Sequence, residues 1–210
     1  DFALDAYTLS GHDGVLDKSG YVDNDKTIEI LSRMATLLAS HGCDVVAPSD
    51  MMDGRVRAIR NSLEKAKMRN TCILSYSSKF ASNFYSPFRD ALGSKKNLGD
   101  SNKNSYQIDF RNFNEAIKET LEDIQEGADI VMVKPAMYYL DIINEIKKKS
   151  LVPVAAFQVS GEYSMIKIAA ENNYLDLKDC VFESLACIKR AGADIIFSYF
   201  SNEVATWLTE

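Results

Sequence analysis

The chain has 210 residues, of which 46% are apolar and 26% are charged, and its formal net charge at pH 7 is −6. These proportions are ordinary for one folded domain, so we expect neither a disordered chain nor two large domains. The negative charge argues against a nucleic-acid partner, because phosphate binding needs a basic surface, and no apolar run is long enough to suggest a membrane-spanning helix.

The first predicted elements, in chain order, are a short strand over residues 2–5 and an amphipathic helix over residues 25–40. A local pattern then occurs three times, over residues 42–46, 127–131 and 192–196. Each copy has a glycine, a small residue, an aspartate and an apolar β-branched pair. Glycine suits the left-handed position that closes a helix, and an apolar run suits a strand buried on both faces. The pattern therefore predicts repeated passages from a helix to a parallel strand.

The remaining predicted elements continue this alternation. Strands are predicted over residues 71–76 and 152–159, and helices over residues 114–126 and 177–191. Six strands that alternate with helices indicate an α/β fold. We predict a single partial TIM-barrel domain over residues 1–210, a (β/α)8 barrel that lacks its first strands, with an open parallel sheet as the alternative.

A long segment without helical or strand periodicity follows the strand at residues 71–76. It covers residues 82–107 and contains Pro87, Gly93, Gly99 and three lysines. Long loops inside a compact domain are usually functional lids or disordered insertions. Because this segment begins soon after a strand ends, we predict an active-site lid.

Two lysines stand at the ends of predicted strands, where lysines are uncommon. Lys134 ends the apolar run of residues 130–133, and Lys79 follows the strand at residues 71–76. The C-terminal ends of barrel strands form one active-site face, so we expect both ammonium groups at the same mouth. A partly desolvated lysine beside a second cation has a lowered pKa and becomes a nucleophilic amine. The alternative is that each lysine only extends from its strand end into solvent.

Four segments resemble the motifs of one enzyme family. Residues 75–90 and 132–135 are similar to the two lysine motifs of the porphobilinogen synthases, also called 5-aminolevulinate dehydratases. Residues 47–56 and 158–163 resemble two further motifs, and the resemblance runs in the family's order over residues 1–207. Motifs of this length are highly specific, so the chain is identified as a member of that family.

The resemblance implies a lyase that joins two 5-aminolevulinate molecules into porphobilinogen with loss of water, a step of heme, chlorophyll and other tetrapyrrole biosynthesis. It implies that Lys134 forms a Schiff base with the first substrate and that Lys79 forms one with the second. An iminium makes the carbonyl carbon electrophilic and the neighbouring protons acidic, as carbon–carbon bond formation requires.

The resemblance also assigns substrate binding to six residues. The positions that hold the first carboxylate are matched by Ser160 and Tyr199. The lid positions that hold the second carboxylate are matched by Arg89, Lys103 and Gln107, and Asp1 matches a further substrate-binding position. A guanidinium fork suits a carboxylate, so this acidic chain is expected to concentrate its cations at the pocket.

Residues 1–14 resemble the region where zinc-dependent members of the family carry three cysteines. This chain has Ala3, Asp5 and Asp13 there. Thiolates select zinc whereas carboxylates suit magnesium, so no active-site zinc is expected, and Asp5 and Asp13 either hold a hydrated magnesium ion or are solvated without an ion. Glu119 matches the glutamate that holds an allosteric magnesium in many non-animal members, so Mg²⁺ is the expected cofactor.

Three departures from the family pattern are visible. Phe157 stands where the family usually has tyrosine, and the stretch at residues 101–105 makes the lid longer by two residues. The family's N-terminal arm and first barrel strands are absent from the sequence given. The arm organises the family's octamer, so octamer formation by this chain stays an open question.

The compartment and two other functions also stay open. Four scattered cysteines without metal-ligand spacing suggest free thiols in a reducing compartment, either plastid or cytoplasm. The chain opens without Met or a signal-like segment, so we expect the start of a longer protein to be missing. Another Schiff-base barrel enzyme, such as an aldolase, would explain one strand-end lysine but not the second, and a divergent or truncated pseudoenzyme would explain Phe157 and the altered lid.

Overall fold

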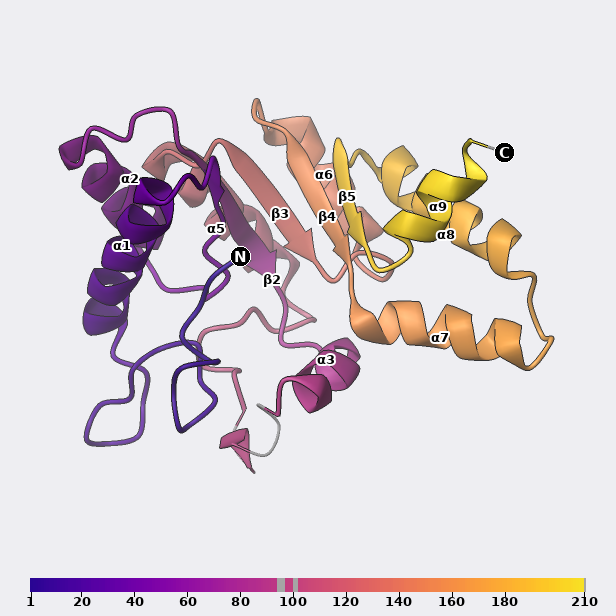
Figure 1. The fold of residues 1–210 in the computed structure, drawn as a ribbon, viewed down its shortest axis with the longest axis horizontal. Coiled ribbons are helices and arrows are strands. Elements are labelled where there is room, and N and C mark those ends of the chain that lie inside the picture. The colour runs from indigo at the N-terminus through magenta and orange to yellow at the C-terminus, as the bar shows by residue number, and fades with distance from the viewer. Residues whose placement is uncertain (94–96, 100–101, 210) are drawn as a thin grey trace.

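The computed structural model describes residues 1–93, 97–99 and 102–209, and within these ranges the chain forms one parallel sheet. Its strands are β1 (Val45–Val46), β2 (Cys72–Lys79), β3 (Ile130–Lys134), β4 (Val154–Gln158) and β5 (Ile195–Ser198). They lie in sequential order, and each neighbouring pair is parallel. Parallel neighbours need crossover connections, which helices provide here (Figure 1).

The helices connect and flank these strands, and three of them confirm the sequence prediction. α1 (Asn24–Ser40), α5 (Phe113–Glu126) and α8 (Leu177–Ala191) lie within one residue of their predicted bounds. The glycine of each repeated pattern has a positive φ, as predicted for a residue that closes a helix. The others are α2 (Arg55–Lys65), η1 (Asn83–Tyr85), α3 (Ser86–Ala91), α6 (Leu140–Lys149), α7 (Ser160–Glu171) and α9 (Ser201–Trp207).

Strand side chains alternate between two apolar clusters. Ile73, Val131 and Val154 belong to a large cluster shared with helix residues, whereas the intervening Leu74 and Met132 belong to a small cluster built from strand residues and Ala47. Helices on one face and sequential strand order are the arrangement of a barrel, because a doubly wound sheet reverses its strand order. The described residues therefore form a five-stranded half-barrel. None of their helices is long and apolar enough to cross a membrane.

The predicted strand over residues 2–5 is not formed. Phe2 makes one parallel bridge to Pro48, and pairing stops there. The chain turns at Leu4, whose carbonyl oxygen accepts a hydrogen bond from the Tyr7 backbone N–H at 2.8 Å. Residues 1–14 thus lie as a loop beside the strand ends.

An irregularity in β2 sets the direction of its last side chains. Between two paired positions, β2 advances three residues while β3 advances two. The extra residue changes the face toward which the following side chains point. The hydroxyl groups of Ser75 and Ser78 therefore both donate hydrogen bonds to residues of α5. Lys79, in contrast, lies in register with Lys134 of β3.

The predicted lid begins with two short helices, η1 and α3, which lie on the side toward which the arrowheads of β2 and β3 point (Figure 1). α7 approaches η1 so closely that a Cβ atom on Gly161 would lie 2.5 Å from the Phe84 carbonyl oxygen. Only glycine fits there without a shift of the backbone. Residues 94–96 and 100–101 of the lid, including part of its lengthened stretch, lie outside the described residues.

Candidate active site

A cavity of about 330 Å³ lies at the C-terminal ends of β2 and β3. Its lining includes five residues that the sequence singled out: Asp1, Asp5, Asp13, Lys79 and Lys134. The two strands supply the lysines, the loop over residues 1–14 supplies the carboxylates, and the lid supplies Phe88 and Leu92. The prediction that both lysines lie at one mouth is confirmed by this arrangement.

Aromatic rings surround the Lys134 ammonium. Its Nζ atom lies 4.2 Å from the centroid of the Phe157 ring, 5.0 Å from that of Tyr76 and 5.6 Å from that of Tyr85. Burial among these rings, together with the positive charge of Lys79, lowers the pKa of Lys134 to about 7. In a large share of the molecules Lys134 is therefore an unprotonated amine near neutral pH. This is the form that attacks a carbonyl carbon.

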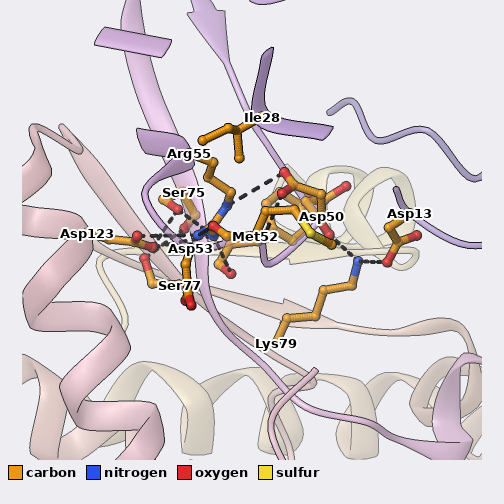
Figure 2. A network of polar contacts seen from close by, with 12 residues as sticks. Asp13, Ile28, Asp50, Met52, Asp53, Arg55, Ser75, Ser77, Lys79 and Asp123 are labelled. Atoms are coloured by element: carbon orange, nitrogen blue, oxygen red, sulfur yellow. Dashed lines mark hydrogen bonds and ion pairs between the residues drawn. The ribbon is translucent and has the colours of Figure 1, made fainter. Parts of the chain in front are cut away.

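Lys79 has polar surroundings instead. Its ammonium donates a hydrogen bond to the Ser49 carbonyl oxygen and lies 3.6 Å from the Asp13 Oδ2 atom (Figure 2). The side chain is buried, so these two oxygens replace the water that it loses. Lys79 is thus an ion-paired cation next to the caged Lys134.

A buried charge network holds the segment that contains Ser49 (Figure 2). Arg55 contacts both Asp123, with 3.4 Å between Nη1 and Oδ1, and Asp50, with 3.6 Å between Nε and Oδ2. All three side chains are buried, and burial raises the pKa of Asp50 to about 6 although Arg55 opposes the shift. The Asp50 Oδ1 atom also accepts a hydrogen bond from the Met52 N–H at 2.8 Å. The network fixes the turn that presents the Ser49 carbonyl to Lys79.

Asp1 connects that turn to the aromatic cage. Its Oδ1 atom accepts a hydrogen bond from the Ser49 hydroxyl at 2.6 Å, and its Oδ2 atom accepts one from the Tyr76 hydroxyl at 3.1 Å. Asp1 therefore orients one ring of the Lys134 cage and one residue of the Lys79 site.

The lid lysine predicted to bind substrate contacts the two aspartates considered as metal ligands. The Lys103 Nζ atom lies 2.5 Å from Asp13 Oδ1 and 3.4 Å from Asp5 Oδ2. Burial by itself would raise the pKa of Asp13, but the charges of Lys79 and Lys103 outweigh burial and lower it.

Three other predicted substrate residues lie around the cage. The Ser160 hydroxyl, at the start of α7, accepts a hydrogen bond from the Phe88 N–H of the lid at 3.1 Å. The Arg89 guanidinium carbon lies 5.3 Å from the centroid of the Tyr85 ring, and the partly exposed Tyr199 ring lies 6.2 Å from the Phe157 ring. Arg89 and Tyr199 therefore flank rings that contact Lys134, whereas Ser160 bonds a lid residue that lines the same cavity.

Gln107 and Glu119 line a different cavity, of about 440 Å³, together with Asp53 and Glu115. Burial and the negative charges of Asp53 and Glu122 raise the pKa of Glu119 to about 7. The Gln107 Oε1 atom is buried and has no hydrogen-bond partner within the described ranges. Gln107 is thus placed on the Glu119 cavity and not on the lysine cavity. No group of three or more His, Cys, Asp or Glu side chains that could hold a metal occurs among the residues described.

Sequence reasoning gave no role to Tyr76, Tyr85 or Ser49, although all three lie within the quoted motifs. For Tyr76 alone the sequence contains a signal of a role at the site. It is a large aromatic residue between Ser75 and Ser77, on the strand that leads to Lys79. The Tyr85 ring and the Ser49 carbonyl reach the lysines through tertiary packing, which no local pattern reveals.

Comparisons with known proteins agree with this geometry. The family model described as delta-aminolevulinic acid dehydratase matches residues 1–207. The chloroplastic delta-aminolevulinic acid dehydratase of Chlamydomonas reinhardtii is 49% identical over 214 residues, which cover 99% of this chain and 55% of that protein. The delta-aminolevulinic acid dehydratase of Helicobacter pylori is 48% identical over 208 residues, which cover 99% of this chain and 64% of that protein.

A solved structure is similar as well. The crystal structure of delta-aminolevulinic acid dehydratase (porphobilinogen synthase) from Toxoplasma gondii ME49, in complex with the reaction product porphobilinogen, matches with a TM-score of 0.95 and 50% identity. The match covers 98% of this chain and 58% of that chain. This chain spans about half the length of most of the curated relatives that it matches.

Proposed function

Because the chain belongs to the delta-aminolevulinic acid dehydratase family, we propose that it acts as a porphobilinogen synthase, a lyase that condenses two 5-aminolevulinate molecules into porphobilinogen with loss of water. The observation that carries the proposal is the pair of register-matched lysines at one cavity, of which Lys134 has a pKa of about 7. A Schiff-base reaction of a ketone needs such an amine.

Lys134 supplies the first step of the proposed reaction. Its unprotonated amine attacks the ketone carbon of one 5-aminolevulinate, and the adduct takes up one proton and loses water, which leaves an iminium. Lys79 acts on the second molecule in the same way after it passes its proton to a neighbouring base. Asp13 lies 3.6 Å from the Lys79 Nζ atom, and because its pKa is lowered it holds this ammonium in place and leaves the proton to another base. The aromatic cage excludes water from the first iminium and so slows its hydrolysis.

The substrate carboxylates would be held by polar groups around the cage. For the first carboxylate we propose Ser160 and Tyr199, and for the second we propose Arg89 with Lys103 and Gln107, while Asp1 holds the cage in place. The support from geometry is strongest for Arg89, whose guanidinium lies over the Tyr85 ring of the Lys134 cage. Gln107 would have to turn toward that cavity, since it lines the neighbouring one.

Closure of the half-barrel is a further part of the proposal. We propose that these five strands belong to an eight-stranded (β/α)8 barrel and that residues outside this chain supply the other strands. Ile195 and Phe197 of the edge strand β5 are each 37% exposed, as expected for side chains that further strands would cover. Assembly into the octamer that the resemblance implies belongs to the same proposal.

We propose a magnesium ion at Glu119 and no zinc at the active site. The Glu119 carboxylate has a raised pKa in an acidic cavity, and a cation there would relieve the repulsion from Asp53 and Glu122. One carboxylate with several waters is coordination that magnesium accepts. The Asp5 and Asp13 pair does not fit an ion in the same way, because the Lys103 ammonium already contacts both carboxylates.

A reducing compartment, plastid or cytoplasm, is proposed for this reaction. All four cysteines are free in the structure, which suits such a compartment. The Chlamydomonas reinhardtii relative is named chloroplastic, which supports the plastid.

Borohydride trapping tests the proposed function against the two alternatives. Purified protein is incubated with 5-aminolevulinate or with a sugar phosphate, reduced, and analysed by peptide mass mapping, while porphobilinogen formation is assayed in parallel. Adducts with 5-aminolevulinate on Lys134, together with product, are the expected result. Trapping only with the sugar phosphate would indicate an aldolase, and no adduct with either compound in the full-length protein would indicate a pseudoenzyme.

A further inference from the structure

The contact between Lys103 and two carboxylates has the geometry of a built cation site. The Lys103 Nζ atom lies 2.5 Å from Asp13 Oδ1 and 3.4 Å from Asp5 Oδ2. Asp13 is 1% exposed and Lys103 is 6% exposed, so the ion pair is buried in the protein. A buried carboxylate needs a countercharge, and here the countercharge comes from the chain itself.

A second ammonium completes the neutralisation of Asp13. Lys79 lies 3.6 Å from the Asp13 Oδ2 atom, so each oxygen of this carboxylate faces a different lysine. A magnesium ion binds carboxylate oxygens at about 2.0–2.1 Å and would have to approach both ammonium groups to do so. Repulsion between the three positive charges would disfavour the ion as long as Lys103 stays in place.

The same ion pair ties the end of the lid to the loop over residues 1–14. The Lys103 carbonyl oxygen accepts hydrogen bonds from the N–H groups of Tyr106 and Gln107. The Tyr106 hydroxyl accepts a hydrogen bond from the Asp13 N–H at 3.2 Å and bonds the His12 Nδ1 atom at 3.0 Å. Lys103 therefore arrives at the aspartates on a segment that is itself fixed to them.

We propose that the Lys103 ammonium is the resident cation of the Asp5 and Asp13 pair, so that this pair anchors the lid and takes no metal ion. Divalent ions would enter only when the lysine is removed. This inference concerns the charge of one corner of the cavity in the protein without substrate, and contact of Lys103 with the second carboxylate belongs to the proposed function.

Manganese binding tests the proposal, because Mn²⁺ accepts the same oxygen ligands as magnesium and is observed directly by electron paramagnetic resonance. The parent protein carries Glu119→Ala, which removes the carboxylate proposed for the other ion. Lys103→Met is added to the parent, and Asp13→Asn is added to that double variant. Lys18→Met, at an exposed lysine outside the cavity, is the matched control.

The parent and the Lys18→Met control should bind no Mn²⁺ at the aspartates. Addition of Lys103→Met should create one site per chain and tighten Mn²⁺ binding by at least about ten-fold, because one unit charge at this distance is worth that much near a protein surface. Asp13→Asn should abolish the new site. Circular dichroism confirms folding, and Lys103→Ala replaces Lys103→Met if the latter does not fold.

Two results would overturn the proposal. One is a stoichiometric Mn²⁺ ion in the parent that Asp5→Asn or Asp13→Asn removes. The other is the absence of any gain in folded Lys103→Met or Lys103→Ala protein. Borohydride trapping on the Lys18→Met control separates this proposal from the proposed function. If the Lys134 adduct with 5-aminolevulinate forms while the lysine-for-metal proposal fails, the proposed function still stands.

Discussion

Two lysines end neighbouring strands of one sheet in the same register, yet their surroundings differ completely. Lys134 lies among the rings of Tyr76, Tyr85 and Phe157, whereas Lys79 contacts the Ser49 carbonyl and the Asp13 carboxylate. Water is lost on both sides, but only Lys79 regains oxygen partners. Desolvation therefore lowers the pKa of Lys134 to about 7, and the ion-paired Lys79 adds its charge to that shift.

The difference teaches that position on a strand determines where a lysine lies, while the neighbouring segments determine its chemistry. The cage and the polar site also depend on each other, because Asp1 bonds both Tyr76 and Ser49. A substitution in the aromatic cage of Lys134 and a substitution in the polar site of Lys79 should therefore have effects that can be told apart.

The largest effect is expected from Lys134→Met. It should abolish porphobilinogen formation and borohydride adducts with 5-aminolevulinate, because no other lysine within the described ranges has the aromatic cage. Activity assays and mass mapping provide the measurement. Lys149→Met, at an exposed lysine of α6, is the control and should keep full turnover. Substantial turnover in Lys134→Met would contradict the role of Lys134 as the first nucleophile.

Arg55→Met tests the buried charge network that holds the turn next to Lys79. The substitution leaves Asp50 and Asp123 buried without a countercharge, so the free energy of unfolding should fall by about 3–5 kcal/mol. Arg57→Met breaks an exposed contact with Glu126 and should cost less than about 1 kcal/mol. Denaturant titration measures both, and equal losses would contradict the role given to the buried network.

Arg89→Ala separates the two substrates. It should weaken saturation by the second 5-aminolevulinate by about 10- to 100-fold, the worth of a hydrogen bond to a charged group, and leave the Lys134 adduct intact. Steady-state kinetics and trapping on the same samples measure the two effects. Arg111→Ala, at an exposed arginine paired with Asp109, should change neither. Loss of the adduct in Arg89→Ala would argue against its lid role.

The smallest effect concerns metals. A zinc-selective chelator should leave activity unchanged, because the described residues that line the lysine cavity include no cysteine. Magnesium should stimulate activity, and Glu119→Ala should remove that response. The proposal for Glu119 fails if this variant keeps both the magnesium response and the oligomer distribution. Activity-linked stoichiometric zinc would contradict the interpretation of residues 1–14.

Much of the scaffold could be predicted from the sequence, because its signals are local. Each repeated glycine pattern closes a helix and opens a parallel strand, and apolar runs place Lys79 and Lys134 at strand ends. Burial of these strands on both faces was predicted too, but in the edge strand β5 Ile195 and Phe197 are each 37% exposed. The prediction of a strand over residues 2–5 was wrong, because a turn at Leu4 ends the pairing after one bridge. Periodicity over four residues cannot reveal such a turn.

The details of the site could not be predicted, because they depend on contacts between distant segments. The serine-rich end of β2 contains no local pattern that predicts the extra residue, which brings Lys79 into register with Lys134. The cage combines rings from β2, η1 and β4, and Lys103 meets Asp13 across ninety positions of the chain. Residue types suggested the chemistry, and only packing assigned the partners.

The pH dependence of adduct formation tests the central claim most directly. The rate of borohydride trapping by 5-aminolevulinate is measured between pH 5 and pH 10, and the modified lysine is identified at each pH. The amine form of Lys134 is the nucleophile, so the rate should rise as the pH passes through about 7, with the first adduct on Lys134. A first adduct on Lys79, or a rate that rises only near the ordinary lysine pKa, would contradict the account.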